Sequence, residues 1–447
     1  MPRARGLLGG MSKQAKLFGG DEGPRTKKPA FLGAPRVLRP ERQQVELRPS
    51  CLEELLHDKH RARTLWAAVL ELDLSRFEAG IDAREGGAGR PAIDPAILVT
   101  LWLYGTMEGV GSARELERLC ESTDAYRWIC GGVSVNHHTL SDFRVAHEAA
   151  LDELMTQVLG ALMHEGLVTL RRVAQDGMRV RASAGAKSFR RERSLKQCLL
   201  KARQQVRDVK RQLASEGGAT TRRQAAAKVR AAQERVAQVR RALAHLQQVR
   251  EVKETSEARE QARASTTDPE ARVMRMADGG YRPAYNVQLA TDVDGRVIVG
   301  VQVTNRGADA AQMEPMLEAI ERRTGTLPRE HLVDGGYVKL DAIEAVAAQG
   351  VAVLAPPTTP RSVRDPRRAL RGDGPGVMAW RRRMASRRGR DLYKRRAATA
   401  ETTNADLRTW RGLDRFGVRG VGKVLCVALW SALAFNLLRL MAERAVT

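Results

Sequence analysis

Apolar residues recur every three or four positions between about residues 49 and 165, which predicts a helical region. Asp94, followed by a proline, predicts the start of one helix. Ser112 precedes an acid by three positions and predicts a capping box at the next helix, and Thr139 is predicted to cap a third. Short helices with a basic surface favour a helix-turn-helix-like DNA-binding module in which Arg144 is a candidate DNA contact, and a plain helical bundle is the alternative.

Residues 167–183 change to the period of a strand, with Asp176 near the middle of the segment. Farther along, the pattern predicts strands at 284–290, 296–303, 330–333 and 351–354, and helices at 308–322 and 340–349. The order is therefore three strands, a helix, a strand, a helix and a strand, which predicts an α/β fold with a mixed sheet.

Two long amphipathic helices interrupt this pattern at residues 190–262. Apolar residues from Leu195 to Leu213 and from Val229 to Leu246 alternate steps of three and four, and Glu216-Gly217-Gly218 separates the two runs. Two seams of similar length predict an antiparallel coiled coil whose arms are each about 30 Å long. Arg and Lys fill the outer positions, for which a solvated charged face is the simplest interpretation.

The C-terminal part is predicted to contain one helix from about 380 to 407 and an almost wholly apolar helix at 421–441. The longest apolar run, 424–438, is too short to span a bilayer, so we expect a buried helix and no membrane partner. The five cysteines are scattered without metal-ligand spacing, and no secretory signal is recognised. We therefore expect a cytoplasmic protein with reduced thiols.

Charge is the strongest bulk property of the chain. It carries 76 Lys and Arg against 52 Asp and Glu, a net charge of +24. An excess of this size indicates a polyanionic partner, and nucleic acid is the first candidate. A solvated surface or a basic face on a membrane are the alternatives. Residues 1–47, which are basic and rich in Gly and Pro, are predicted to be a disordered arm.

Three acids stand out by their positions in the predicted elements. Asp176 lies on the first strand of the sheet, Asp334 at the end of the fourth, and Glu401 on a helix after the last strand. This order describes a ribonuclease-H-like core in which the first and fourth strands are neighbours. Asp176 and Asp334 are therefore expected side by side, with Glu401 laid across them. Spacing alone does not single out these three, because Asp341 or Asp406 could replace one of them.

Three carboxylates at one place suit phosphodiester chemistry. Two divalent ions about 3.5–4 Å apart can activate an attacking oxygen and stabilise a leaving oxygen. Hard ions such as Mg²⁺ bind carboxylate oxygens. We therefore expect Asp176, Asp334 and Glu401 to hold two Mg²⁺ or Mn²⁺ ions for phosphodiester exchange.

Several segments carry a family resemblance. They are HHTLSDFR at 137–144, AQDGMRVRASAG at 174–185, STTDPEARVMR at 265–275, HLVDGGYVKLDAIEA at 331–345 and AETTNADLR at 400–408. From about residue 48 onward the chain resembles DDE transposases of bacterial insertion sequences. It most resembles the insertion-sequence-five-like superfamily, in the branch with a coiled-coil insertion after the first aspartate. The resemblance implies a ribonuclease-H-like core, Mg²⁺ or Mn²⁺, and transposon-end DNA, with the family's acids falling on Asp176, Asp334 and Glu401.

Many relatives carry a Tyr, an Arg and a further basic residue around the glutamate on its helix. The resemblance makes Tyr393, Arg396 and Arg408 the candidates for these DNA-contacting positions. Arg408 lies seven residues after Glu401, which is two helical turns. Arg396 lies five residues before Glu401, where a step of four is commoner, and Ala397 occupies that position.

Together these observations predict a multidomain α/β transposase that cuts DNA with water and joins a 3′-hydroxyl to target DNA. The expected parts are an arm at 1–47, a helical DNA-binding domain at 48–165, the first core strand at 166–189, a coiled-coil insertion at 190–262 and the remaining core at 263–447. We expect a homodimer on double-stranded DNA, associated with the bacterial nucleoid. The alternatives are an inactive DNA-binding or regulatory relative, a nuclease without strand transfer, and a coiled-coil scaffold.

Overall fold

The computed structural model describes residues 51–83, 86, 91–215, 222–357, 365 and 367–445. The predicted arm at 1–47 and the predicted helix break at Glu216-Gly217-Gly218 lie outside the described residues.

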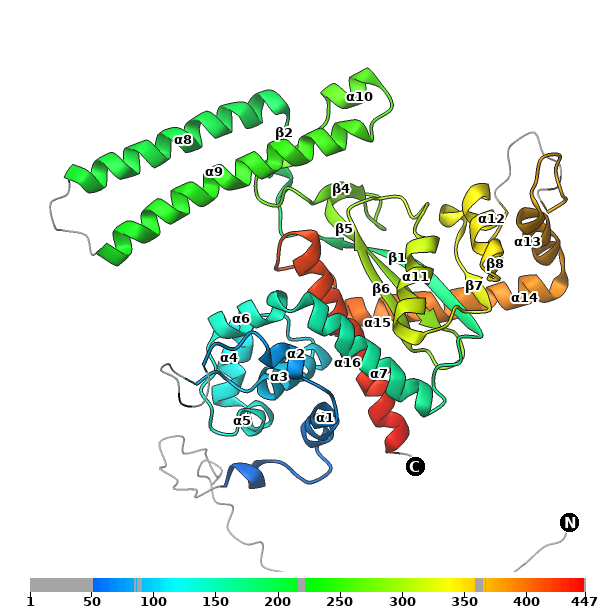
Figure 1. Cartoon of the computed structure of the whole chain (residues 1–447), viewed down its shortest axis with the longest axis horizontal. Helices are drawn as coiled ribbons and strands as arrows, with labels where there is room; N and C mark the ends of the chain where they lie inside the picture. The colour runs from blue at the N-terminus through cyan, green and yellow to red at the C-terminus, as the bar shows by residue number, and fades with distance from the viewer. Residues whose placement is uncertain are drawn as a thin grey trace, which may run out of the picture. The chain divides into compact units, whose positions relative to one another are not determined.

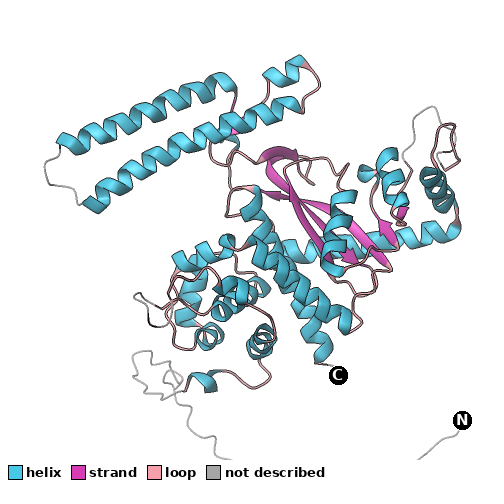
Figure 2. Cartoon of the chain, in the orientation of Figure 1, coloured by secondary structure: helices cyan, strands magenta, loops and turns pink. Residues whose placement is uncertain are grey.

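A mixed sheet forms the centre of the fold (Figures 1 and 2). Its strands are β1 (Arg172–Arg181), β4 (Arg272–Arg275), β5 (Tyr281–Asp292), β6 (Ile298–Thr304), β7 (Glu330–Leu332) and β8 (Ala352–Leu354). β1 pairs antiparallel with β5 and parallel with β7, β7 pairs parallel with β8, and β6 and β4 pair antiparallel with β5. The order β6-β5-β1-β7-β8 confirms that the first and fourth predicted strands are neighbours, and it is consistent with a ribonuclease-H-like core.

Within this sheet the structure adds one strand that the pattern did not predict and lengthens another. β5 has 12 residues, five more than the predicted 284–290, because three residues at its start pair with β4 and two at its end pair with β1. β4 has only four residues, two of them arginines, so it carries too little periodicity to be recognised.

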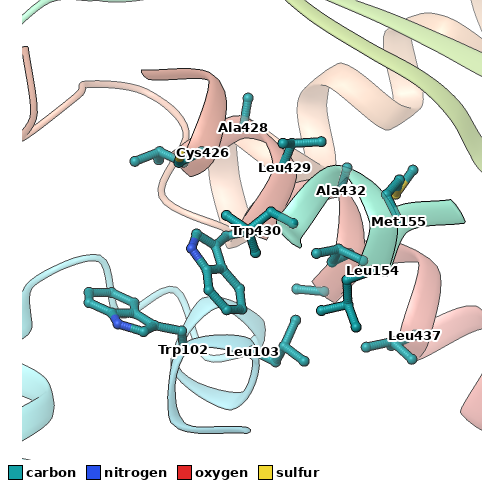
Figure 3. Close-up of a cluster of buried hydrophobic side chains, with 14 of the residues drawn as sticks. Trp102, Leu103, Leu154, Met155, Cys426, Ala428, Leu429, Trp430, Ala432 and Leu437 are labelled. Carbon is teal, nitrogen blue, oxygen red and sulfur yellow. The ribbon is translucent and has the colours of Figure 1, made fainter. Parts of the chain in front are cut away.

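The N-terminal part is helical, as predicted. Its helices are α1 (Arg61–Leu70), α2 (Ser75–Glu78), α3 (Pro95–Met107), α4 (Ala113–Ser122), α5 (Asp124–Cys130), α6 (His137–Ala146) and α7 (Glu148–His164), after a short 3-10 turn at Leu52–Leu55. One hydrophobic cluster joins these helices to the sheet and to α16 (Val421–Arg444). Figure 3 shows Trp102 of α3, Leu154 of α7 and Trp430 of α16 in this cluster.

α16 is the buried helix that the sequence predicted. By length and composition the whole helix could cross a membrane, because it is longer than the apolar run 424–438 on which the prediction was based. However, 78% of its most apolar window is buried inside the fold. It packs against α7, α3, α6 and β6, and Asn436 within it accepts from the Ile298 amide at 2.9 Å and donates to the Ile298 carbonyl at 2.8 Å. These contacts are those of a core helix.

Helix starts follow the predicted caps with one correction. Asp94 accepts from the Ala96 amide at 2.7 Å, and Ser112 accepts from the Glu115 amide at 3.4 Å. Thr139 is not a cap, because α6 already begins at His137, capped by Asn136, whose side chain accepts from the Thr139 amide at 2.9 Å. Asn is among the strongest capping residues, which explains the earlier start.

A second hydrophobic cluster lies around β7 and β8 and contains Tyr337 and Trp380. Its surrounding elements are α11 (Met313–Thr324), α12 (Leu340–Ala348), α13 (Pro375–Ala385) and α14 (Arg387–Arg396), followed by a π-helical turn at Ala397–Glu401 and α15 (Thr402–Trp410). The single helix predicted from 380 to 407 is therefore wrong. Ser386 has extended backbone angles and caps α14 by accepting from the Gly389 amide, which separates α14 from α13.

The insertion after β1 contains α8 (Glu192–Ser215) and α9 (Arg222–Glu251). The two helices run antiparallel, because Leu195 near the start of α8 clusters with Leu246 near the end of α9. At the base of the insertion, β2 (Phe189–Arg190) pairs with β3 (Ala264–Ser265), and α10 (Ser256–Glu260) precedes β3. Whether these helices supercoil as a coiled coil stays a prediction, as do the domain boundaries.

Candidate active site

Asp176 lies in the middle of β1, opposite Leu289 of β5. One carboxylate oxygen accepts from Arg396 Nη2 at 2.9 Å, and the other accepts from Asn404 Nδ2 at 2.9 Å. The side chain is only 19% exposed, so both oxygens are held in a partly enclosed position.

Asp334 follows β7 and is brought next to Asp176 by the sheet. In the parallel pairing of β1 with β7, Ala174 is opposite Leu332, and each aspartate lies two residues beyond its paired residue. The backbone amide of Gly336 donates to Asp334 Oδ1 at 2.7 Å, which begins the 3-10 turn Gly335–Tyr337. This leaves Oδ2 on the side of Arg396.

Glu401 is the last residue of the π-helical turn, and its side chain is 65% exposed. Arg396 lies at the other end of this turn and contacts all three predicted carboxylates. Its guanidinium nitrogens are 2.9 Å from Asp176, 3.6 Å from Asp334 and 3.9 Å from Glu401. The structure therefore brings the three acids together around one buried positive charge.

The π-helical turn accounts for the unusual spacing of Arg396 and Glu401. In an α-helix, residues four apart lie on one face. A π-helix makes i→i+5 hydrogen bonds and accommodates one extra residue in a turn, often at a functional site. With the turn at Ala397–Glu401, a step of five residues places Arg396 and Glu401 on the same side.

The electrostatics at Asp176 reflect its crowded surroundings. Burial raises the pKa of its carboxyl, the guanidinium of Arg396 opposes this shift, and the nearby Asp334 carboxylate adds to it. Tyr393 is half-buried on α14, and burial likewise raises the pKa of its phenol. Two acids this close repel each other, so a cation is needed to keep both of them ionised.

Among the residues that the structure describes, no group of three or more His, Cys, Asp or Glu side chains is arranged to hold a metal ion. The chemistry of the donor set nevertheless fits a divalent cation. Carboxylate oxygens are the ligands that hard divalent cations take, and Asp176, Asp334 and Glu401 already share one positive charge. The buried Asn404 Oδ1 beside them has no hydrogen-bond partner in the described part of the chain.

A groove of about 560 Å³ opens beside the acids. Asp176, Glu401 and Asn404 line it, together with Arg181, Arg282 and Arg408. Arg408 is exposed and has no ion-pair partner among the described residues, and it faces the same groove as Glu401, as the two-turn spacing predicted.

Several of these groove residues were not anticipated. Asn404 lies three residues after Glu401, one helical step away, and that spacing was a usable signal. Arg181 and Arg282 reach the groove only through the pairing of β1 with β5, which local sequence does not reveal.

Arg144, the predicted DNA contact in the N-terminal helices, does not line this groove. Its guanidinium covers the Trp102 ring at 4.5 Å and donates to the Gly111 carbonyl at 2.7 Å. A DNA contact by Arg144 stays a prediction.

Two protein-family models together match most of the described chain. A transposase domain (DUF772) matches residues 50–146, and a transposase DDE domain matches residues 252–437. The second match contains Asp334 and Glu401, and Asp176 precedes it. No curated protein and no solved structure matches the chain.

The mixed sheet and the helices around it are consistent with the ribonuclease-H-like fold of a DDE-type polynucleotidyl transferase. With both domain matches, the chain belongs to the DDE transposases of insertion sequences. It is a DNA transposase, an enzyme of a family whose substrate is DNA and whose members use divalent metal ions.

Deleting Ala398 tests the role of the π-helical turn. Ala398 is exposed, so its loss removes no packing. We expect the turn to become α-helical, with Arg396 four residues before Glu401 and still beside it, and DNA cleavage to be retained. Deleting Ala405 in α15 is the matched control, because it rotates the part of the helix beyond Asn404, including Arg408 of the groove, and should abolish cleavage. Loss of cleavage on deleting Ala398, in a protein with parental circular dichroism, would contradict this account.

Proposed function

We propose that the chain catalyses metal-dependent strand cleavage at transposon ends and strand transfer into target DNA, with Asp176, Asp334 and Glu401 as its catalytic and metal-binding residues. One observation carries the proposal: these three acids, far apart in sequence, all reach the guanidinium of Arg396. The alternatives are an inactive DNA-binding or regulatory relative and a nuclease without strand transfer. The presence of all three acids argues against the first.

Asp176, Asp334 and Glu401 would hold two Mg²⁺ or Mn²⁺ ions, which supply activation of the attacking oxygen and stabilisation of the leaving oxygen. The chain orients these ligands in advance. Asn404 fixes one oxygen of Asp176, and the Gly336 amide fixes one oxygen of Asp334. Glu401 stays exposed at the mouth of the groove, where it can meet the DNA strand.

Arg396 balances the charge of the acids before metal and DNA bind. A buried guanidinium is costly unless it is paired, and here three carboxylates pair with it. The oxygens that Arg396 contacts are those that a metal ion would need. A metal ion held by these carboxylates would compete with Arg396 for their oxygens, and the planar guanidinium of Arg396 is also suited to pair with a DNA phosphate.

The groove beside the acids suits a DNA backbone. Arg408 is free to pair with a phosphate, whereas Arg181 and Arg282 are paired with Asp414 and Asp278 at 3.3 and 2.8 Å. Both of these pairs are largely exposed and can exchange for phosphates at little cost. Such contacts position the strand without reading its sequence.

The remaining expectations extend this proposal. The helical part at 48–165 would help to recognise transposon ends, and pairing of two ends favours a homodimer. We further propose that the protein acts in the cytoplasm at the nucleoid, without a membrane partner. We also propose that the whole catalytic core has the ribonuclease-H-like fold, and that the chain belongs to the transposase branch with a coiled-coil insertion.

The substitution Asp176→Asn tests the catalytic assignment. It keeps the shape of the side chain but removes the charge, so we expect cleavage of a duplex carrying the element's own end to fall to background in Mg²⁺. Asp341→Asn is the matched control, since the only hydrogen bond of Asp341 within the described part of the chain is a local one that it accepts from the Ala342 amide. Joined products on a second duplex separate a transposase from a nuclease, which yields nicks alone. If the Asp176→Asn protein cuts as well as the parent, the assignment is wrong.

The substitution Arg396→Gln tests the competition between the arginine and the metal. Without the guanidinium, Mn²⁺ no longer has to displace a paired cation, so its affinity measured by calorimetry without DNA should rise. Arg395→Gln is the control, because this neighbouring arginine pairs with Asp294 and not with the three acids. Weaker Mn²⁺ binding in the Arg396→Gln protein would show that Arg396 assembles the site instead of competing for it.

The helical insertion is a candidate for either DNA clamping or dimer contact, and its charge favours DNA. α8 and α9 together carry fifteen Lys or Arg and only four Asp or Glu. This excess of eleven is nearly half of the net charge of the chain. Arg203, Arg207 and Arg240 line one groove between the two helices, and no acid lines it.

Replacing Arg203, Arg207 and Arg240 together by Gln should weaken binding to a 30-base-pair duplex of arbitrary sequence. Each lost phosphate contact lowers the slope of log affinity against log salt by about 0.9, so the slope should fall by about 2 to 3. Removing Arg387, Arg388 and Arg390 of α14 instead is the control for overall charge. An unchanged slope together with a loss of dimer in sedimentation would identify the insertion as a dimer contact.

A further inference from the structure

We propose that Asp309 is a positioning residue for the transposase reaction, which holds the strand of Asp176 and the turn of Asp334 in register. The inference rests on the proposed function of the three acids. Asp309 lies in the segment between β6 and α11 and is not one of the three predicted acids. Its side chain is only 14% exposed.

Asp309 is hydrogen-bonded to two side chains of β5, the strand that pairs with the strand of Asp176. Its Oδ1 accepts from Asn286 Nδ2 and from Gln288 Nε2, each at 2.7 Å. A largely enclosed carboxylate that accepts two hydrogen bonds is costly to remove, because both amide donors would be left without this acceptor. Its only ion pair in the described part of the chain is a long one, 3.6 Å to Arg179.

Gln288 carries this contact on to Asp334. Its Oε1 accepts from the Tyr337 hydroxyl, and Gln175 on β1 donates to the same oxygen at 2.9 Å. Tyr337 is fully buried and ends the 3-10 turn that Asp334 begins. A chain of hydrogen bonds thus runs from Asp309 through Gln288 to the turn that holds Asp334.

The contact with β1 is equally close. A Cβ on Gly177, the residue after Asp176, would lie 2.3 Å from Asp309 Oδ1 and 2.4 Å from Gln288 Nε2. Only glycine leaves room for these polar atoms against the backbone of β1. The segment of Asp309 is also tied to β1 at both ends, by Arg179 donating to the Gly307 carbonyl at 2.8 Å and by Gln175 donating to the Gln312 carbonyl at 3.0 Å.

These contacts give Asp309 a role that acts through other residues. It makes no hydrogen bond to any of the three acids. Instead it packs against the strand of Asp176 and is linked through Gln288 to the turn that follows Asp334. Residues that orient metal ligands in this way typically contribute a factor of about 10 to 100 to metal affinity or activity. The hydrogen-bonding oxygen, and not the negative charge, is the feature that carries the positioning.

Two substitutions at one position separate the oxygen from the charge. Asp309→Asn keeps an acceptor oxygen for Asn286 and Gln288, and we expect Mn²⁺ affinity and cleavage close to those of the parent. Asp309→Ala removes the acceptor, and we expect Mn²⁺ affinity from calorimetry and kcat for cleavage of an end-bearing duplex each to fall by about 10- to 100-fold. KM for the duplex should stay near the parental value, because no DNA contact is lost.

Tyr337→Phe provides a second variant in case Asp309→Ala does not fold. It keeps the buried ring but removes the hydroxyl link to Gln288, and the same loss in kcat and Mn²⁺ affinity is expected. Asp391→Ala is the control, because this exposed acid pairs with Lys394 away from the site. Parental Mn²⁺ affinity and kcat in both Asp309→Ala and Tyr337→Phe would overturn the inference. Equal losses in Asp309→Asn and Asp309→Ala would also overturn it, since the charge would then be responsible.

The outcome is distinguishable from failure of the proposed function. If the parent protein does not cleave end-bearing DNA in Mg²⁺ or Mn²⁺, the assignment of the three acids fails first. If the parent cleaves, Asp176→Asn does not, and Asp309→Ala matches the parent, only the role of Asp309 fails.

Discussion

The parallel pairing of β1 with β7 is the contact on which the rest of the site depends. It brings Asp176 level with Asp334, although 158 residues separate them in the chain. Two carboxylates placed side by side repel each other, so the backbone that carries them must be held independently of the site. β1 supplies that support because it lies inside the sheet, with Val173 and Ala174 fully buried and β5 paired along its whole second edge.

The charge created by this pairing explains the next features of the site. The guanidinium of Arg396 neutralises the two aspartates and reaches Glu401, so the third acid is oriented by the same group that compensates the first two. The π-helical turn follows from this requirement. It adds one residue between Arg396 and Glu401 while keeping both on the acidic side, at a place where irregular helix geometry is expected to be functional.

Periodicity was sufficient to predict the order of most strands and helices along the chain. The ribonuclease-H-like core that this order describes then predicted that the strands of Asp176 and Asp334 are neighbours. Periodicity could not reveal β4, which is too short, or the break at Ser386, where a single cap interrupts a helical pattern. The Arg396–Glu401 spacing departed from the four-residue step that is commoner among the resembled transposases, and the π-helical turn that explains it has no signature in one sequence. Asn404 could have been predicted from its helical spacing to Glu401. Asp309 could not, because only the tertiary fold places its segment against Gly177.

The position of the helical insertion shows why the core can tolerate it. It leaves the core after Phe189–Arg190 and returns at Ala264–Ser265, and these two short strands pair with each other. The ends of the insertion are therefore held together at its base, and its length adds little to the entropy of closing the core. A separate small cluster containing Leu195, Leu246 and Ala264 stabilises that base. Because β1 and β5 pair beyond this point, the basic helices can vary in length and charge while Asp176 keeps its place in the sheet.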